Sequence, residues 1–169
     1  MNHLLFLDNV LTKSECEQII EESRGSMTSG FHKDWMYEYA DYTNEIPSLL
    51  RGAQNTVESY LKEFPEMNMT ENSWSLKQFR LKHFPPNYGF TKWHSEHTYD
   101  YPYRIACILF YLTDHDCGTE FYNSGEVIKS KVGRAVIFPT SWTHTHRGQI
   151  CPEGKSRYII STYLHLNAK

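Results

Sequence analysis

The spacing of apolar residues divides the chain into a helical first part and a strand-rich second part. Apolar side chains recur at helical spacing over residues 46–64, and Pro65 marks the end of this helix. A shorter helix is expected to begin at the capping-box sequence of residues 12–15 and to run to about Arg24, where Gly25 fits its end. The first third of the chain is therefore predicted to be partly helical.

Short apolar runs separated by glycine and proline follow Ser73 and predict strands. Residues 105–112 are apolar throughout, which is typical of a strand buried on both faces. The expected strands, including a short one near the N-terminus, are 4–7, 74–84, 104–112, 119–122, 126–130, 134–138 and 157–165. Helices followed by many short strands predict a mainly β fold with flanking helices, a β-sandwich or jelly roll with the helices packed on one sheet.

The length and composition fit one globular domain. The 169 residues suffice for a single core, and 40% hydrophobic with 22% charged residues is typical of a folded domain. An aromatic content of 15% favours β structure. Because we find no repeat, low-complexity tract or linker, we expect a single domain over 1–169, with helical support over 1–72 and a jelly-roll core over 73–166.

Charge and cysteine patterns narrow the class of partner and the compartment. The net charge is −3 and no basic run stands out, so neither a nucleic acid nor a membrane is expected as a partner. No signal peptide is recognisable, and no apolar run reaches the ~20 residues that span a bilayer. The four cysteines lack a C-x-x-C pair, which argues against a zinc ribbon and leaves disulfides open. We expect a cytoplasmic location.

Two of the nine histidines stand in a context that suggests metal binding. His94 and Glu96 are two residues apart, so in a strand they would project from one face and share an ion. His144 follows an apolar strand and stands five residues after Pro139, where it would be a third ligand from a neighbouring strand. Three protein ligands on one face leave open positions, as in non-haem Fe(II) oxygenases, whereas a structural zinc site closes all four.

Arg157 opens the last predicted strand and is a candidate anion-binding residue. A buried guanidinium is costly unless it is paired, and a substrate carboxylate is a good bidentate partner. The ordinary alternative is a salt bridge to one of the twenty acidic residues of the chain.

The candidate residues belong to an ordered set of short motifs. These are Trp93-His94-Ser95-Glu96, residues 104–113, Gly118-Thr119-Glu120-Phe121, Ile137-Phe138-Pro139, Trp142-Thr143-His144 and Gly154-Lys155-Ser156-Arg157-Tyr158. In this order and spacing, the motifs resemble the Fe(II)- and 2-oxoglutarate-dependent dioxygenases, specifically the prolyl 4-hydroxylase-like branch with its small phage and bacterial members. The resemblance covers roughly residues 76–164 and implies a double-stranded β-helix, which is a jelly roll.

The resemblance implies a site and a reaction. His94, Glu96 and His144 would hold Fe(II), and Arg157 with Tyr111 would bind the distal carboxylate of 2-oxoglutarate. With O2, the enzyme would hydroxylate an unactivated C–H and release succinate and CO2, and ascorbate is a candidate reductant. A peptidyl proline is the substrate that analogy suggests, among peptide, protein and small-molecule substrates. Two tyrosine-rich stretches, 35–42 and 99–103, are candidate substrate contacts.

The chain departs from the family pattern at two ligand positions. Relatives usually carry Asp where this chain has Glu96, which is one methylene longer, and Asp100 is a fallback ligand. The pair His144 and His146 leaves the distal ligand open, although the offset from the preceding proline favours His144. Phe84 stands where many relatives have a tyrosine beside the co-substrate, so we expect only an apolar contact there.

Two other classes of protein fit parts of the pattern. A cupin-type metal enzyme would use His94 with His144 or His146 but would have no need for a carboxylate clamp made by Arg157 and Tyr111. A non-enzymatic β-sandwich binding module would leave its histidines scattered, so that the candidate ligands do not converge.

Overall fold

Local sequence signals determine where the first helix begins and ends. The structure, a computed structural model, describes residues 3–32, 35–42, 46–69, 73–152 and 154–167. The expected capping box opens the first helix: Thr12 accepts a hydrogen bond from the Glu15 amide at 3.2 Å, and the Glu15 carboxylate accepts one from the Thr12 amide at 2.8 Å. Gly25, with φ of +105°, follows its end.

Antiparallel strands make up most of the molecule. The helices are α1 Lys13–Ser23 and α2 Pro47–Glu63, with 3-10 turns η1 Pro65–Asn68 and η2 Trp142–His144. The strands are β1 Leu5–Leu7, β2 Thr28–His32, β3 Trp35–Tyr42, β4 Trp74–Phe84, β5 Arg104–Tyr111, β6 Gly118–Phe121, β7 Val127–Lys129, β8 Arg134–Pro139, β9 His146–Gly148 and β10 Arg157–Leu166.

The strands form two sheets. The large sheet has seven strands in the order β1-β8-β5-β10-β4-β3-β2, and the small sheet has three in the order β7-β6-β9. All strand pairs are antiparallel. This mainly β architecture with two long helices agrees with the predicted fold class and is consistent with a jelly roll.

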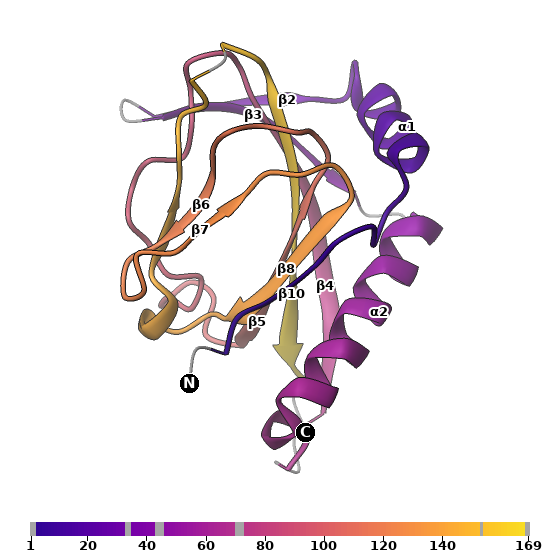
Figure 1. The fold of residues 1–169 in the computed structure, drawn as a ribbon, viewed down its shortest axis with the longest axis vertical. Helices are drawn as coiled ribbons and strands as arrows, with labels where there is room; N and C mark the ends of the chain where they lie inside the picture. The colour runs from indigo at the N-terminus through magenta and orange to yellow at the C-terminus, as the bar shows by residue number, and fades with distance from the viewer. Residues whose placement is uncertain (1–2, 33–34, 43–45, 70–72, 153, 168–169) are drawn as a thin grey trace.

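Each face of the large sheet is covered by a different hydrophobic cluster. On β5, Ile108 and Phe110 belong to a cluster shared with α1 and α2, whereas Leu109 and Tyr111 belong to a second cluster that includes Phe121 of the small sheet. This alternation follows the two-residue period of a strand, and it confirms that β5 is buried on both faces. In Figure 1, α2 lies along one side of the large sheet, and β6 and β7 lie on the other.

Three strands were not predicted. Strands β2 and β3 extend the large sheet beyond β4, within the first part of the chain that was expected to be helical support. Strand β9 pairs with β6 and begins directly after the turn η2. The tyrosine-rich stretch 35–42 is therefore strand β3, but its side chains, except that of Tyr39, lie outside the described residues.

Candidate metal centre and anion pocket

His94 and His146 lie side by side because their backbones pair. The His94 amide donates to the His146 carbonyl at 3.0 Å, and the His146 amide donates to the His94 carbonyl at 2.9 Å. This isolated bridge places the loop after β4 beside the first residue of β9. The two imidazole centroids are 4.4 Å apart.

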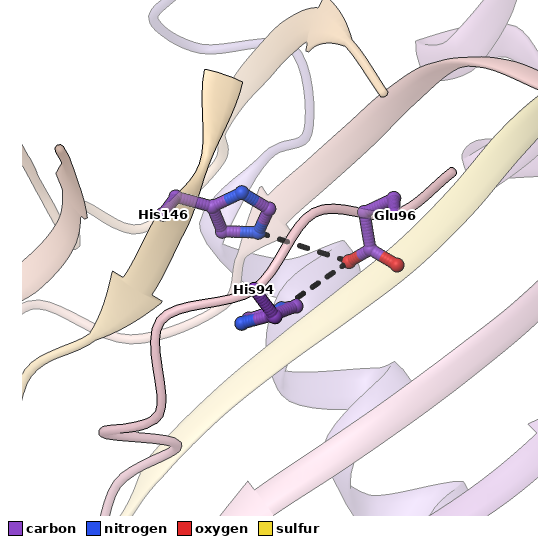
Figure 2. A group of neighbouring side chains, drawn as sticks. All are labelled: His94, Glu96 and His146. Carbon is purple, nitrogen blue, oxygen red and sulfur yellow. Dashed lines mark ion pairs between the residues drawn. The ribbon is translucent and has the colours of Figure 1, made fainter. Parts of the chain in front are cut away.

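Glu96 completes the group. Its amide donates to the Thr140 carbonyl at 3.1 Å, which fixes the loop against the end of β8. Its Oε1 lies 3.7 Å from Nε2 of His94 and 3.7 Å from Nε2 of His146 (Figure 2). One ligand atom from each of the three residues falls within 4.8 Å of the others, a spacing that allows one metal ion to contact all three.

Hydrogen bonds to backbone carbonyls orient both imidazoles. Nδ1 of His146 lies 2.9 Å from the His144 carbonyl, and Nδ1 of His94 lies 2.9 Å from the Lys92 carbonyl. A carbonyl only accepts hydrogen bonds, so each Nδ1 carries the proton and each Nε2 presents its lone pair to the centre of the group. That tautomer is the one required of a metal ligand.

The second oxygen of Glu96 is held by two donors. Nη1 of Arg104 and the Tyr163 hydroxyl both donate to Oε2, each at 3.1 Å. The Arg104 guanidinium itself lies 3.7 Å from the ring centroid of Tyr101 and 3.5 Å from that of Tyr163. These contacts leave Oε1 turned toward the histidines. They explain how the carboxylate of Glu96, whose side chain is one methylene longer than that of Asp, is fixed at this position.

The electrostatics favour an ionised Glu96 carboxylate and a neutral His146 imidazole. Burial alone would raise the pKa of Glu96, but the nearby His146 and His94 side chains and the positive charge of Lys82 hold it well below its usual range. Burial lowers the pKa of His146, although the nearby Glu96 carboxylate opposes that shift. Two neutral imidazoles and one carboxylate are the donor set of a divalent metal, so the residues fit Fe(II).

His144, which the sequence favoured as the third ligand, lies outside this group. The 3-10 turn η2 interrupts the extended chain that the five-residue offset assumed, and β9 starts only at His146. The ring of His144 instead approaches its neighbour Thr143, with Nδ1 at 2.9 Å from Oγ1, and its carbonyl orients His146. Asp100, the fallback for Glu96, is exposed and also outside the group.

Arg157 lines the same pocket as the three clustered residues. It is only 2% exposed, and its Nη1 donates to the Gly118 carbonyl at 3.1 Å. Its Nε is buried and has no hydrogen-bond partner among the described residues. A side chain on Gly148 would come within 2.9 Å of Nη2 of Arg157, so the glycine leaves space around this guanidinium. The pocket therefore presents donors suited to a carboxylate.

Tyr111 lies near Arg157 but its hydroxyl is engaged elsewhere. It donates to Oγ1 of Thr119 at 2.7 Å, and burial raises the pKa of Tyr111 to about 12. Thr119 lines the pocket and Tyr111 stands behind it. Phe84 also lines the pocket, and its ring centroid lies 5.0 Å from the guanidinium carbon of Arg157.

A disulfide joins Cys117 to Cys151 beside this anion pocket. The sulfur of Cys117 lies 3.5 Å from Nη1 of Arg157. Cys16 and Cys107 are free and buried.

Sequence reasoning missed four residues that shape the site: Arg104, Tyr163, Thr119 and Lys82. A two-residue period from Arg157 along β10 leads to Tyr163, and the same period back from Phe84 along β4 leads to Lys82. The signal was therefore present once the strands were assigned. Which of their polar residues meet Glu96 depends on contacts between distant segments.

A family model described as the 2OG-Fe(II) oxygenase superfamily matches residues 80–165, just over half of the 169 residues. This match spans the three clustered residues and Arg157. The chain belongs to the 2OG-Fe(II) oxygenase superfamily. A search of the curated proteins gives no match.

Solved structures show that this oxygenase shares its fold with prolyl hydroxylases. A Pseudomonas putida prolyl-4-hydroxylase matches at a TM-score of 0.76 and 12% identity, covering 99% of this chain and 95% of that one. The viral collagen prolyl hydroxylase of Paramecium Bursaria Chlorella virus-1, in its 2OG complex, matches at a TM-score of 0.71 and 15% identity, covering 96% and 95%.

A prolyl hydroxylase of Trichoplax adhaerens, in complex with a peptide fragment of the hypoxia inducible factor oxygen degradation domain, matches at a TM-score of 0.73 and 16% identity, covering 98% and 84%. The oxygenase is thus an enzyme that uses Fe(II) and 2-oxoglutarate. Within the described residues, no helix has both the length and the apolar character that crossing a bilayer requires.

Proposed function

We propose that this oxygenase hydroxylates an unactivated C–H of a peptide, with a prolyl ring as the leading candidate, and that His94, Glu96 and His146 hold its Fe(II). The observation that supports the ligand set is the convergence of their three ligand atoms within 4.8 Å of one another. The bound iron supplies oxidation by O2, coupled to decarboxylation of 2-oxoglutarate to succinate and CO2.

The residues of the chain have separate tasks in this proposal. Arg157 binds the distal carboxylate of 2-oxoglutarate from a site only 2% exposed, where a charge-assisted bond is little weakened by water. Tyr111 supports this contact through the Thr119 hydroxyl that it holds at 2.7 Å. Arg104 and Tyr163 hold Glu96 in place, and apolar walls that include Phe90 and Leu109 exclude water.

Two observations support a peptide substrate. The fold is that of prolyl hydroxylases, one of which is in complex with a peptide fragment. In addition, Tyr99, Tyr101 and Tyr103 are 98%, 43% and 60% exposed in the segment between Glu96 and Arg104, both of which belong to the site. Rigid aromatic side chains bind peptide and proline rings at low entropic cost.

The convergence at the metal centre argues against a non-enzymatic sandwich, for which scattered histidines were expected. The buried Arg157 in the same pocket argues against a cupin-type enzyme, which needs no carboxylate clamp.

The ligand assignment is tested by a pair of histidine variants. We expect His146→Ala to abolish tight Fe(II) binding and 2-oxoglutarate-dependent succinate release, while His144→Ala retains both. The weak visible charge-transfer band of the anaerobic Fe(II) and 2-oxoglutarate complex provides a direct spectroscopic readout. Loss of the band in His144→Ala with retention in His146→Ala would reverse the assignment of the distal ligand.

The substrate is tested with a peptide library that varies one residue at a time around a central proline. We expect a gain of one oxygen atom by mass spectrometry on peptides that contain the proline, and none when alanine replaces it. Succinate release stimulated equally by both sets of peptides would contradict prolyl hydroxylation while leaving the oxygenase activity intact.

A further inference from the structure

Lys82 is a charged residue of the pocket to which the proposed function assigns no task. It stands on β4 and lines the pocket together with Arg157 and the clustered residues. Among the described residues, no hydrogen bond or ion pair is made by its ammonium group. Burial lowers the pKa of Lys82, while the negative charge of Glu96 opposes the shift. A cation held in such a position without a direct partner is costly unless a ligand compensates it.

The charges within the pocket do not balance without such a ligand. Among the residues that line the pocket, only Glu96 carries a carboxylate. That carboxylate already accepts hydrogen bonds from Arg104 and Tyr163. Arg157 and Lys82 are therefore two cations that face the pocket with no carboxylate of their own. A ligand with two negative charges would compensate both.

The register of the strands places these two cations at a useful separation. Arg157 lies opposite Phe84, and Ile159 lies opposite Lys82, in the pairing of β10 with β4. The two cations therefore lie on the same face of neighbouring strands, about 7 Å apart along the strands and about 5 Å apart across them, so that their Cα atoms are about 8 Å apart. A five-carbon acid with a carboxylate at each end can bridge a gap of this order. Arg157 contacts Cys117 and the Gly118 carbonyl rather than any of the three clustered residues, so we place it at the end away from the metal centre.

We propose that Lys82 binds the carboxylate of 2-oxoglutarate next to its keto group, so that the co-substrate is held by a cation at each end. This inference rests on the proposed function, since it assumes that 2-oxoglutarate enters this pocket with its distal carboxylate on Arg157. It adds a positioning contact that orients the end of the co-substrate nearest the metal centre.

The test compares two keto acids with three variants. Binding of 2-oxoglutarate and of 2-oxopentanoate, which lacks the distal carboxylate, is measured by calorimetry on protein loaded with Mn(II), so that no turnover is needed. The variants are Lys82→Met, Arg157→Met and, as a matched control, Lys77→Met, which removes an exposed charge from the same strand. Methionine keeps an unbranched stem and removes the charge.

Lys82→Met is expected to weaken both keto acids by about tenfold or more, because both carry the carboxylate beside the keto group. The ratio of the dissociation constant of 2-oxopentanoate to that of 2-oxoglutarate should then stay as in the wild type. Arg157→Met should weaken 2-oxoglutarate alone and bring that ratio toward one. Lys77→Met should change neither constant.

Two results would overturn the inference. If Lys82→Met binds both keto acids as the wild type does, Lys82 does not contact the co-substrate, and a negatively charged group on the hydroxylated substrate becomes its partner. If Lys82→Met lowers the ratio as Arg157→Met does, Lys82 binds the distal carboxylate instead. A wild type that binds no 2-oxoglutarate would sink the proposed function itself, which separates the two failures.

Discussion

At the scale of single residues, the added methylene of Glu96 is matched by the groups that hold its far oxygen. A glutamate has one more rotatable bond than an aspartate, so it loses more side-chain entropy when it is fixed in place. Arg104 and Tyr163 supply two hydrogen bonds of 3.1 Å to Oε2, and this leaves Oε1 facing His94 and His146. Groups that orient a ligand in this way commonly change metal affinity when they are removed.

Tyr163→Phe should therefore weaken metal binding without unfolding the protein. The ring that packs on Arg104 remains, while one of the two bonds to Oε2 is lost. We expect the dissociation constant of Mn(II), measured by calorimetry, to rise about tenfold. Tyr60→Phe is the matched control, since it removes a hydroxyl bond of 2.9 Å to the His3 carbonyl in the other hydrophobic cluster. Equal metal affinity in wild type and Tyr163→Phe would contradict the positioning role.

At the scale of elements, the short edge strand β1 is held to β8 by more than its three residue pairs. Asp8, which directly follows β1, accepts hydrogen bonds from Nε of Arg134 at 2.7 Å and from Nζ of Lys131 at 2.9 Å. These side-chain hydrogen bonds, from Arg134 first and Lys131 second, lower the pKa of Asp8 to about 2. The ionised carboxylate thus stabilises the docking of the N-terminal segment.

Asp8→Asn should lower the free energy of unfolding at neutral pH by about 0.5–1 kcal/mol, the range of partly exposed ion pairs. Because the folded pKa is depressed, the contribution is complete above the unfolded value of 3.8 and is lost as the pH falls toward about 2. Urea unfolding of wild type and variant across this range measures the difference. Asp116→Asn, which breaks an exposed pair with Lys129, is the control for the loss of a surface carboxylate. A difference that persists at pH 2 would contradict this explanation.

The sequence predicts a helix or strand well where a strong local signal marks it. It predicts a strand poorly where the strand forms only because a neighbouring strand pairs with it. The bounds of β4, residues 74–84, are as predicted, and the capping box of α1 is confirmed. Strands β2 and β9 have five and three residues and contain glycine, so neither shows a two-residue pattern that could be read in isolation. They exist as strands because β3 and β6 lie beside them.

The same distinction applies to the site. The residue types that converge followed from the sequence, but the convergence of His146 rather than His144 with His94 and Glu96 did not. That arrangement depends on the turn η2 and on the backbone pairing between His94 and His146, which joins segments about fifty residues apart. Lys82 and Tyr163 were overlooked for the same reason, since each becomes relevant only when β4 and β10 lie next to one another.

At the scale of the whole molecule, a disulfide joins two of the four cysteines and leaves the other two free. The bond between Cys117 and Cys151 closes a loop of 34 residues beside Arg157, and bonds of this kind persist in oxidising surroundings. Alkylation of the protein, unfolded without reductant, should label two of the four cysteines, Cys16 and Cys107. Labelling of all four, read by intact mass, would instead match the reducing cytoplasm that the sequence favoured.

Metal binding should also be visible in global stability, because the three ligands come from segments that only the folded chain brings together. At a hundredfold excess over its dissociation constant, Mn(II) should add about 2.7 kcal/mol to the free energy of unfolding. For a chain of this size, that corresponds to a rise in Tm of about 5–10 °C by scanning fluorimetry, reversed by EDTA. His144→Ala should show the rise and His146→Ala should not. If both variants respond as the wild type does, the ion binds elsewhere, and the convergence of His94, Glu96 and His146 is not a metal centre.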